Sequence, residues 1–353
     1  MIGRKSAFFF FVLSSVLFLF SCAFPFLWNI EREITIMTYN VHNLFNAVSE
    51  GGEYPEYDPS GGDWTEEEYE KRLANTADII RGAVRGGPDI VLVQEIERLS
   101  VLRDLVEGYL AGMGYSVYGV EDTANPSTVM VGALSRVPVT KSLVHAVQMR
   151  DGRVGRGILE LWLSSGGVSV VVFNNHWKSK TGGAEGTEPQ RVAEASLLAA
   201  RIAEILEGGE ATDIIAAGDL NEQIDEFERS GQRYPTALGQ AGGSGSIVVL
   251  PIGEPSPAKD QAGSGECLTL LSPWFGVDVE EVGSYWYEGA WERIDHVLMT
   301  PGLVDGEGFD YAEFSVVSLP FMLSEDGVPL TWSSRTGRGY SDHLPLLLTL
   351  ERK

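Results

Sequence analysis

Six apolar segments of this chain end in polar residues of the kinds that bind metal ions, activate water or hold phosphate. Any one of them alone is best explained as a turn or a backbone cap, because Asp after Gly and Asn at a strand end are common there. Six such ends together indicate one site, since the edge of a sheet can hold side chains from distant segments rigidly. The ends read "MTYN", "VQE", "NNH", "GDLN", "RID" and "SDH", and they supply Asn40, Glu95, His176, Asp219 with Asn221, Asp295, and Asp342 with His343.

The stretch "VVVFNNHWKSK" at residues 170–180 combines neutral donors and positive charge in a strongly acidic chain. The sequence holds 50 acidic and 26 basic residues, for a formal net charge of -24. A local group of donors in that background predicts an anion site, with Asn175, His176 and Lys178 as donors to a phosphate. Trp177 alternates to the other side and is expected in the core. Lys180 is explained equally well as a solvated surface charge.

Phosphodiester hydrolysis is the chemistry that these residue types fit. It requires a positioned water, a base and groups that neutralise developing charge. Mg²⁺ binds one or two carboxylates and keeps several waters, and Glu95 is the best carboxylate for it, with Asn40 as a second ligand or positioning group. Asp219 and Asn221 lie on one side of an extended segment, so Asp219 could accept a proton from water while Asn221 donates to a phosphate oxygen. Whether Asp219 or His343 is the base stays open.

The ordered set of motifs resembles the endonuclease/exonuclease/phosphatase superfamily, which includes DNase I-like nucleases, sphingomyelinases and inositol-polyphosphate phosphatases. The resemblance covers nearly all of residues 34–350 except the Gly-rich loops. It implies an α+β fold: a four-layer α/β sandwich with two mostly antiparallel sheets packed face to face and helices outside. It is carried, in order, by "MTYNVHNLF", "DIVLVQEIE", "ALSRVPV", "NNHWKSK", "AAGDLNE", "ERIDHVLM" and "YSDHLPL". The segments "EPQRVAEA" and "SYWYEGAW" are most similar to bacterial exported nuclease-type members.

The resemblance also implies roles for single residues. His343 corresponds to the catalytic histidine and Asp295 to the carboxylate that orients it. Asp342 is expected as a further metal or water ligand beside Asn40 and Glu95, and His176 is expected to donate to a non-bridging phosphate oxygen. The expected cofactor is Mg²⁺, with Mn²⁺ or Ca²⁺ as alternatives. The remaining expected substrate contacts are Arg136, which matches a family position near the site, and Arg156 and Arg191.

The elements that must position these residues are mainly strands. Many strands with few helices between them favour antiparallel or mixed sheets in layers. Thr65 and Glu68 form a capping box for a helix that reaches about Val84. A second long helix is expected over 189–206, and the Gly-rich segment 232–265 is expected to be a mobile surface excursion. Strands are expected at 33–40, 88–95, 116–120, 128–134, 137–147, 157–163, 168–173, 213–221, 293–299, 312–317 and 344–350.

The first 30 residues read as an export segment ahead of a single domain over residues 31–353. Arg4 and Lys5 precede an apolar run, and Cys22 follows it in a lipoprotein-like box. An uncleaved membrane anchor is the alternative. Either one predicts an extracytoplasmic protein, held in the cell envelope by its N-terminus or secreted. With Cys22 lipidated or removed, Cys267 stands alone and no internal disulfide forms. A monomer is expected.

The function expected from the sequence is an exported, divalent-metal-dependent phosphodiesterase, most simply a DNA or RNA nuclease. The acidic balance predicts weak, salt-sensitive binding of nucleic acid. One alternative is a sphingomyelinase-like or inositol-phosphate phosphohydrolase. A lipid enzyme would need an exposed aromatic hairpin, for which "PWFGV" and "SYWYEGAW" are candidates, although core packing is the expected role of those aromatics. A second alternative is a catalytically silent surface binding protein on the same scaffold.

Overall fold

The computed structural model describes residues 32–119, 128–148, 154–239, 246–254, 267–278 and 282–353. The predicted export segment, with Arg4, Lys5 and Cys22, lies outside the described residues. Among the helices that are described, none is long and apolar enough to cross a membrane.

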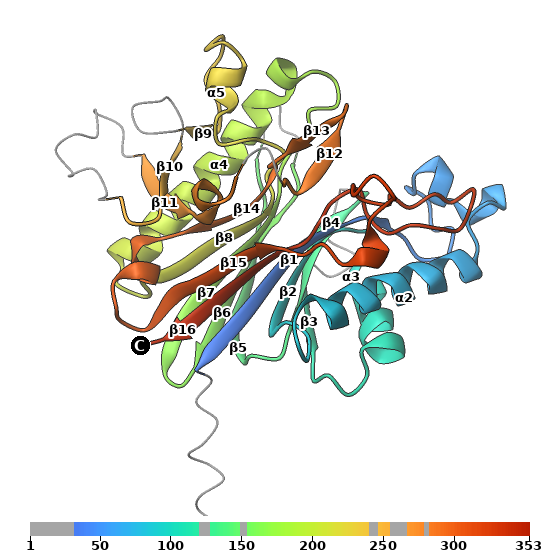
Figure 1. The fold of residues 1–353 in the computed structure, drawn as a ribbon, viewed down its shortest axis with the longest axis horizontal. Coiled ribbons are helices and arrows are strands. Elements are labelled where there is room, and N and C mark those ends of the chain that lie inside the picture. Colours follow the sequence, from blue (N-terminus) through green and yellow to red (C-terminus); the bar gives the residue numbers. More distant parts are fainter. Residues whose placement is uncertain (1–31, 120–127, 149–153, 240–245, 255–266, 279–281) are drawn as a thin grey trace, which may run out of the picture.

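Two large mixed sheets pack against each other (Figure 1). Most neighbouring strands run antiparallel, and the parallel pairs are β1 with β2, β7 with β8, and β10 with both β9 and β11. The six-stranded sheet has the order β15 (Phe309–Val316), β16 (Leu346–Arg352), β1 (Glu33–Leu44), β2 (Ile90–Ile96), β4 (Met130–Ser135), β3 (Ser116–Gly119). The eight-stranded sheet has the order β5 (Val139–His145), β6 (Ile158–Ser165), β7 (Val168–His176), β8 (Asp213–Asp219), β14 (Asp295–Met299), β11 (Leu268–Ser272), β10 (Ile247–Pro251), β9 (Leu238–Gly239).

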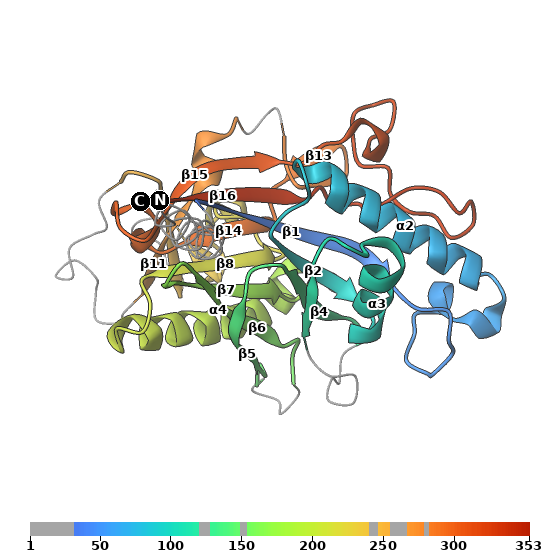
Figure 2. The ribbon, with the colours of Figure 1, turned by 90° about the horizontal axis from the view of Figure 1, so that it is seen from below.

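Helices cover the outer faces of the two sheets, so the molecule has four layers (Figure 2). Helices α2 (Glu66–Ala83) and α3 (Leu99–Asp104) lie on the six-stranded sheet, and α4 (Ala184–Glu207) lies on the eight-stranded one. The predicted α+β sandwich is therefore confirmed. The smaller elements are α5 (Glu226–Arg229), a π-helical turn (Leu105–Tyr109), the hairpin of β12 (Tyr285–Tyr287) and β13 (Ala290–Glu292), and 3-10 turns at Pro55–Tyr57, Pro59–Gly61, Pro273–Gly276, Pro301–Val304 and Pro320–Met322.

Three apolar cores fill the three spaces between the layers. The core between the sheets contains Ile36, Leu92, Val172 and Ala217, all buried, and neighbouring residues of the same strands point outward to the helices. This division follows from the two-residue period of a strand. Strands buried on both faces read as continuous apolar runs, which is why "DIVLV" and "VVVF" carry no polar alternation.

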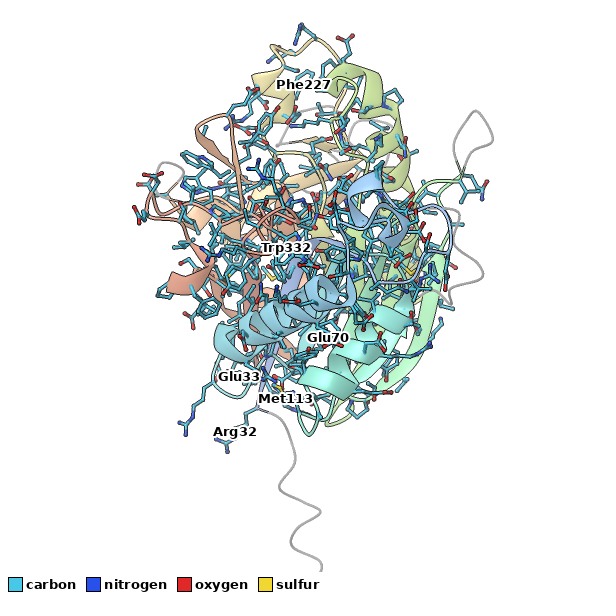
Figure 3. The ribbon with its side chains drawn as sticks, turned by 90° about the vertical axis from the view of Figure 1, so that its right-hand side faces the viewer. Arg32, Glu33, Glu70, Met113, Phe227 and Trp332 are labelled. Carbon is cyan, nitrogen blue, oxygen red and sulfur yellow. The ribbon has the colours of Figure 1, made fainter. Side chains whose placement is uncertain are left out.

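The N-terminus of α2 is capped as predicted. The Thr65 hydroxyl accepts a hydrogen bond from the Glu68 N–H at 3.4 Å and contacts the Glu68 carboxylate. Farther along α2, the buried Arg72 stacks on Trp332, whose ring also meets Trp64 at 6.4 Å. Figure 3 looks onto this side, with Glu70 on the helix and Trp332 above it. The segment that carries Trp332 is thereby fixed over one end of α2.

The segment 232–265 is not the surface excursion that its composition predicts. Its described part contributes β9 and β10 to the eight-stranded sheet, and Leu238, Ile247 and Val249 are buried under α4. Glycine and serine between these short strands hide the pattern, and the parts at 240–245 and 255–266 lie outside the described residues.

Candidate functional site

The ends of four parallel-running strands and the start of a fifth bring the predicted residues to one edge. Residues His176, Asp219 and Asp295 are direct neighbours across β7, β8 and β14, because His176 pairs in register with Asp219 and Asp219 with Asp295. Side chains at paired positions of adjacent strands lie on the same face. The three groups therefore form a row, and the Nε2 atom of His176 is 3.6 Å from an Asp219 carboxylate oxygen.

The six-stranded sheet adds Asn40 and Glu95 from the other side of the interface. The Asn40 amide donates to the Asp219 carboxylate at 3.0 Å, so it joins the two sheets directly. Its oxygen accepts from the His42 backbone N–H at 2.9 Å. Glu95 accepts from the Asn43 backbone N–H at 3.0 Å, and its other oxygen is 3.5 Å from His176 Nε2. The site is thus assembled across the boundary between two layers.

Unusual backbone geometry aims the Glu95 side chain. The ladder between β1 and β2 shifts register between Asn40 and Leu44, and Glu95 has φ +63. Only six non-glycine residues of the described chain have positive φ, and four of them lie here: His42 (55), Asn43 (56), Glu95 and Asn221 (51). Such conformations cost on the order of 1–3 kcal/mol each and persist where surrounding structure enforces them. Their concentration at this edge indicates a functional constraint.

His343 is held in one orientation by Asp295. Its Nδ1 lies 2.7 Å from an Asp295 oxygen, and both side chains are buried. Burial alone lowers the pKa of His343, but the carboxylates of Asp295, Asp342 and Asp219 outweigh burial and raise it well above its ordinary value. Nε2 faces the centre, 4.0 Å from Asp219 and 3.9 Å from Asp342. The Ser341 hydroxyl donates to the Asn40 carbonyl and accepts from the His343 N–H, which ties the segment to β1.

Asp219 is the most perturbed carboxyl group of the cluster. Burial, and then the neighbouring Asp295 carboxylate, raise the pKa of Asp219 to about 7. One oxygen accepts from the Asn221 backbone N–H at 2.9 Å, and the Asn221 amide donates to the Trp177 carbonyl at 3.1 Å. A carboxyl group with a pKa near neutrality can exchange a proton at working pH.

The surroundings of His176 differ from the predicted ones. Arg156 donates to its Nε2 at 2.8 Å, so this nitrogen is an acceptor and the proton lies on Nδ1. Burial and then the Arg156 charge lower the pKa of His176 well below its ordinary value. The predicted donation from His176 to a phosphate oxygen is therefore not available from Nε2. The charged donor at this point is Arg156, which the sequence assigned to substrate and which also binds the Trp177 carbonyl at 3.0 Å.

Three predicted substrate contacts do not reach the site. Asn175 points to the opposite face of β7, where its amide donates to the carbonyls of Phe173 and Ala217 and accepts from Trp177. Arg136 follows the last residue of β4, which is antiparallel to β2, so it lies beside Asp89 at the other end of the sheet, roughly 20 Å from Glu95 at about 3.3 Å per residue.

Arg191 is the third misplaced contact. It is completely buried in α4, and all of its guanidinium nitrogens are bound within the protein. They donate to Glu188, Glu222, the Thr187 hydroxyl and two backbone carbonyls. No donor is left for a phosphate, so Arg191 has a structural role here.

The two lysines of the stretch 170–180 have different surroundings. Lys178 is partly exposed, its N–H donates to Glu194 at 2.8 Å, and its ammonium lies 3.4 Å from the Ser179 hydroxyl. Lys180 forms an ion pair with Glu226 at 2.6 Å. Of these two lysines, Lys178 is the one that is closer in sequence to His176.

Among the described residues, two groups of acidic and histidine side chains have the geometry to hold a metal ion. They are Glu95, His176 and Asp219, and then Asp219, Asp295 and His343, with ligand atoms within 4.8 Å of one another in each group. Of the predicted acidic ligands, Glu95 belongs to the first group and Asp342 to neither, while the predicted ligand Asn40 contacts Asp219 at 3.0 Å. Asp342 instead faces His42 Nδ1 at 3.4 Å. Like charges at Glu95, Asp219 and Asp295 raise the Asp219 pKa, and a hard cation would offset that repulsion. The donor set therefore fits a divalent cation.

Sequence reasoning missed two positioning groups. Arg72 sends its guanidinium from α2 to the carbonyls of Val41, His42 and Tyr340, which fixes the segments before Asn43 and before Ser341. Gln94 and Asn174 join the two sheets by an amide hydrogen bond of 2.5 Å. The second pair could have been found from "QE" and "NNH", since period two places Asn174 on the same face as His176, and Gln94 directly precedes Glu95.

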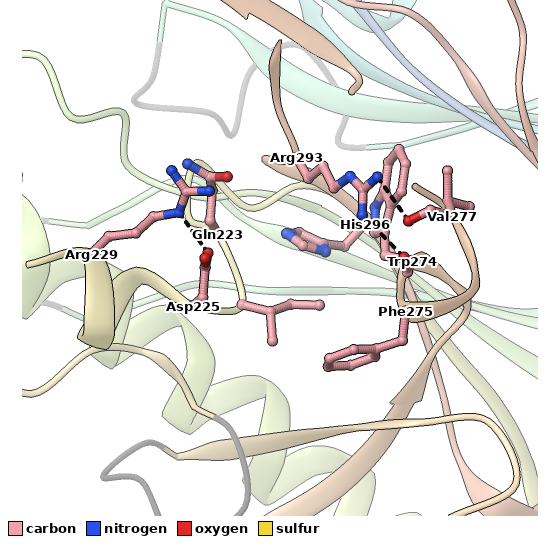
Figure 4. A pocket seen from close by; sticks show the side chains of 9 residues that line it. Gln223, Asp225, Arg229, Trp274, Phe275, Val277, Arg293 and His296 are labelled. Atoms are coloured by element: carbon pink, nitrogen blue, oxygen red, sulfur yellow. Dashed lines mark hydrogen bonds and ion pairs between the residues drawn. The ribbon is translucent and has the colours of Figure 1, made fainter. Parts of the chain in front are cut away.

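A pocket of about 230 Å³ is lined by none of the cluster residues (Figure 4). His296 lines it and points to the opposite face of β14 from Asp295, as the alternation predicts. Its Nε2 donates to the Glu222 carbonyl at 2.8 Å, and burial lowers its pKa to about 4. Arg293 in the same pocket is bound to backbone carbonyls. The pocket is therefore not part of the catalytic edge.

Comparisons with known proteins agree with the fold. A selenomethionine TDP2 structure from Caenorhabditis elegans shares 16% identity over 90% of this chain and 74% of its own, with a TM-score of 0.55. Danio rerio TDP2 complexed with single strand DNA product shares 15% over 91% of this chain and 100% of its own, with a TM-score of 0.52. An endonuclease/exonuclease/phosphatase family protein from Bacteroides thetaiotaomicron shares 16% over 91% of this chain and 98% of its own, with a TM-score of 0.50. No curated protein matches the sequence.

The two stacked sheets and the acidic, histidine-containing edge define a protein with the scaffold of the phosphoric-ester hydrolases. The family model described as "Endonuclease/Exonuclease/phosphatase family" matches residues 35–239, which is more than half of the chain. The chain belongs to the endonuclease/exonuclease/phosphatase family, as the resemblance of its motifs predicts.

Proposed function

We propose that this protein is a divalent-metal-dependent phosphodiesterase that cleaves nucleic acid. The observation that carries the proposal is the convergence of Glu95, Asp219 and Asp295 with the Asp295–His343 pair at one edge between the sheets. Structural pairs neutralise their charges, whereas three carboxylates around two histidines leave excess negative charge for a bound cation. That arrangement fits hydrolysis of a phosphate ester better than simple binding.

We assign the cation to Glu95 and Asp219, with Asn40 fixing the Asp219 carboxylate. A bound Mg²⁺ would neutralise charge on the substrate phosphate and on the leaving oxygen. Asp219, fixed by the Asn40 amide and the Asn221 N–H, is the group placed to accept a proton from water. His343 is charged at neutral pH, because its pKa is raised, and its Nε2–H faces the same space as a donor to phosphate oxygen. Arg156 adds a second charged donor on the His176 side.

Nucleic acid is supported as the substrate by one related fold and by the chain's charges. The Danio rerio TDP2 structure, with which this chain shares its fold, was solved with single strand DNA product. Arg156 and Lys178 place positive charge beside the row of carboxylates in an otherwise acidic protein. A sphingomyelinase-like or inositol-phosphate activity is the alternative that the substrate panel must separate.

The test is hydrolysis by the purified full chain in Mg²⁺ and in EDTA. The panel contains single-stranded DNA, duplex DNA, RNA, sphingomyelin and inositol phosphates. We expect cleavage of nucleic acid in Mg²⁺ only, lost in Asp295→Asn and in His343→Ala. Release of phosphocholine or of inorganic phosphate from inositol phosphates, with nucleic acid intact, would replace the proposal by the alternative. Unchanged cleavage in the two variants would remove the site assignment.

We also propose that residues 1–30 export the protein and that Cys22 is lipidated. The support is the order of basic residues, apolar run and cysteine in "GRKSAFFFFVLSSVLFLFSC". Mass spectrometry of the membrane-bound full-chain product tests it. A mature N-terminus at an acylated Cys22 is expected, and a product that keeps residues 1–21 would favour an uncleaved anchor.

A further inference from the structure

Two tyrosines form a flat aromatic surface that begins at the catalytic histidine. The Tyr285 ring lies 4.7 Å from the His343 ring, tilted by 32°. The Tyr287 ring continues the stack at 6.0 Å from Tyr285, with an interplanar angle of only 13°. Tyr287 is 50% exposed, so one face of its ring is open to solvent. We call Tyr285 and Tyr287 the tyrosine ledge. The sequence predicted core packing for the aromatic residues of "PWFGV" and "SYWYEGAW". This prediction is wrong for Tyr287 and for Phe275, which is 42% exposed.

The ledge is rigidly mounted on the catalytic residues. The Ser284 carbonyl accepts from the Leu344 N–H at 2.7 Å, and the buried Ser284 hydroxyl accepts from the Asp295 N–H at 3.2 Å. Tyr285 also forms an isolated antiparallel bridge with His343. On the other face of the hairpin, Trp286 and Trp291 meet edge to face at 5.2 Å, and Trp291 packs on the core under α2. One face of the hairpin is therefore structural, and the other faces the site.

We propose that the tyrosine ledge binds the unpaired base of the nucleotide next to the scissile phosphate, so that the enzyme acts on single-stranded nucleic acid or frayed ends rather than on intact duplex. This inference rests on the proposed nuclease function. The two rings are too close to admit a base between them, which leaves the open face of Tyr287 as the stacking surface. Any base can stack on it, because every base has a π-face.

Charge favours an unpaired strand over a duplex. Duplex binding depends on neutralising many phosphates with Lys and Arg, and this chain has a net charge of -24. Near the edge, Lys180 is already paired with Glu226. Stacking supplies affinity that does not need further positive charge, whereas a paired base inside a duplex has no free face for Tyr287.

The tip of the hairpin argues against a membrane as the occupant. Strands β12 and β13 are joined by Glu288 and Gly289, both exposed. A hairpin that enters lipid would present apolar or basic residues at its tip, and a carboxylate there is repelled by anionic headgroups. The ring faces also stack back toward His343 instead of leading outward.

The experiment compares two oligonucleotides with the full-length enzyme in Mg²⁺. One is a single-stranded DNA with all its bases, and the other has the same sugar-phosphate chain with tetrahydrofuran in place of every base. For wild type we expect a KM about 5- to 100-fold lower on the base-containing strand, the range that stacking of one base supplies. Tyr287→Ala should raise KM on that strand to the base-free level and leave kcat unchanged. Tyr287→Trp should restore the low KM, and Phe275→Ala is the matched control that changes neither.

The outcomes separate the ledge from the nuclease function. Equal KM values for the two oligonucleotides in wild type, or no effect of Tyr287→Ala, would overturn the ledge while leaving the nuclease in place. A wild-type enzyme that cleaves no oligonucleotide would overturn both. Loss of sphingomyelin hydrolysis in Tyr287→Ala, with oligonucleotide KM unchanged, would assign the ledge to lipid. Faster cleavage of intact duplex than of the single strand would also contradict it.

Discussion

Polar residues lie at both ends of the six-stranded sheet, but their charges are paired at one end and not at the other. Where β2 begins, one Asp89 oxygen accepts from the N–H and the hydroxyl of Thr35, and the other accepts from Arg136 at 2.9 Å. Arg136 also donates to the carbonyls of Gly86 and Gly87. The charges of Asp89 and Arg136 are paired with each other, so this end needs no ligand.

Where β2 ends, the same kinds of residue are left in conflict. Asp219 is buried beside Asp295, which raises its pKa to about 7, and Glu95 adds a third negative charge. Glu95 and Asn221 adopt positive φ. The comparison teaches that a polar strand end does not by itself mark a functional site. The mark is a cluster whose charges do not cancel, held by a backbone that is under strain.

The largest expected effect distinguishes the His343–Asp295 pair at the site from the His145–Glu160 pair elsewhere in the protein. His343→Ala should lower hydrolysis by about 10²- to 10⁴-fold, because it removes a charged donor from the reacting phosphate. His145 is the matched control: it also meets a buried carboxylate, Glu160, at 2.6 Å, but on the side of α4. His145→Ala should lose stability and keep its activity per folded molecule. Steady-state rates at equal folded concentration decide, and equal losses in both variants would break the comparison.

A divalent cation should stabilise the protein through the end of the sheet that carries Glu95, and not through the end that carries Asp89. Mg²⁺ at about 100 times its Kd should raise the free energy of unfolding by about 2.7 kcal/mol. Glu95→Gln should remove most of this gain, since it removes one negative ligand, whereas Asp89→Asn should keep it. Denaturant titrations with Mg²⁺ and with EDTA measure the difference. A gain that is the same in Glu95→Gln would place the cation elsewhere.

At the satisfied end the expected effect is on stability. Asp89→Ala should lower the free energy of unfolding by about 2 kcal/mol, because it leaves the Thr35 N–H and the Arg136 guanidinium without their acceptor. The kcat of the folded protein should not change, since this end lies a strand length from Glu95. Urea denaturation and rate measurements at low temperature test both parts. A drop in kcat larger than the loss of folded protein would contradict this assignment.

The smallest expected effect is a pH dependence of stability from Glu194, behind β7. Burial raises the pKa of Glu194 from 4.5 to about 8, and one of its oxygens has no hydrogen-bond partner. The folded state then holds a proton that the unfolded state has released, so stability falls as pH rises from about 4.5 to 8. Glu194→Gln should match wild type at pH 5 and exceed it at pH 9, because the amide stays neutral across this range. Parallel stability curves for the two proteins across this range would refute the shift.

The fold and the set of catalytic residues could be predicted because both are carried by short local patterns. The Thr65 capping box and the apolar strands are read directly from the chain, and the ordered motifs identify the family. The face on which a residue lies was predictable for His296 but was misjudged for Asn175. Period two counted from His176 places Asn174, not Asn175, on the inner face.

The remaining errors concern relations that only the folded chain fixes. Arg136 was placed at the site because its position depends on the antiparallel pairing of β4 with β2. Arg191 was assigned to phosphate, although its partner Glu188 is visible one turn earlier in the helix; Glu222, from another segment, is not. The donor to His176 is Arg156, and no local pattern in the sequence links the two.

The amide bridges between the sheets have one further consequence. Asn40 with Asp219, and Gln94 with Asn174, connect the two layers beside the site, whereas most of the surface between the layers is apolar. Sliding of one layer over the other would carry Glu95 away from Asp219 without breaking a single strand pairing. Heating should therefore abolish activity at a temperature where circular dichroism still reports intact strands. Enlarging a side chain in the middle of the interface between the sheets should abolish activity in the same way at room temperature.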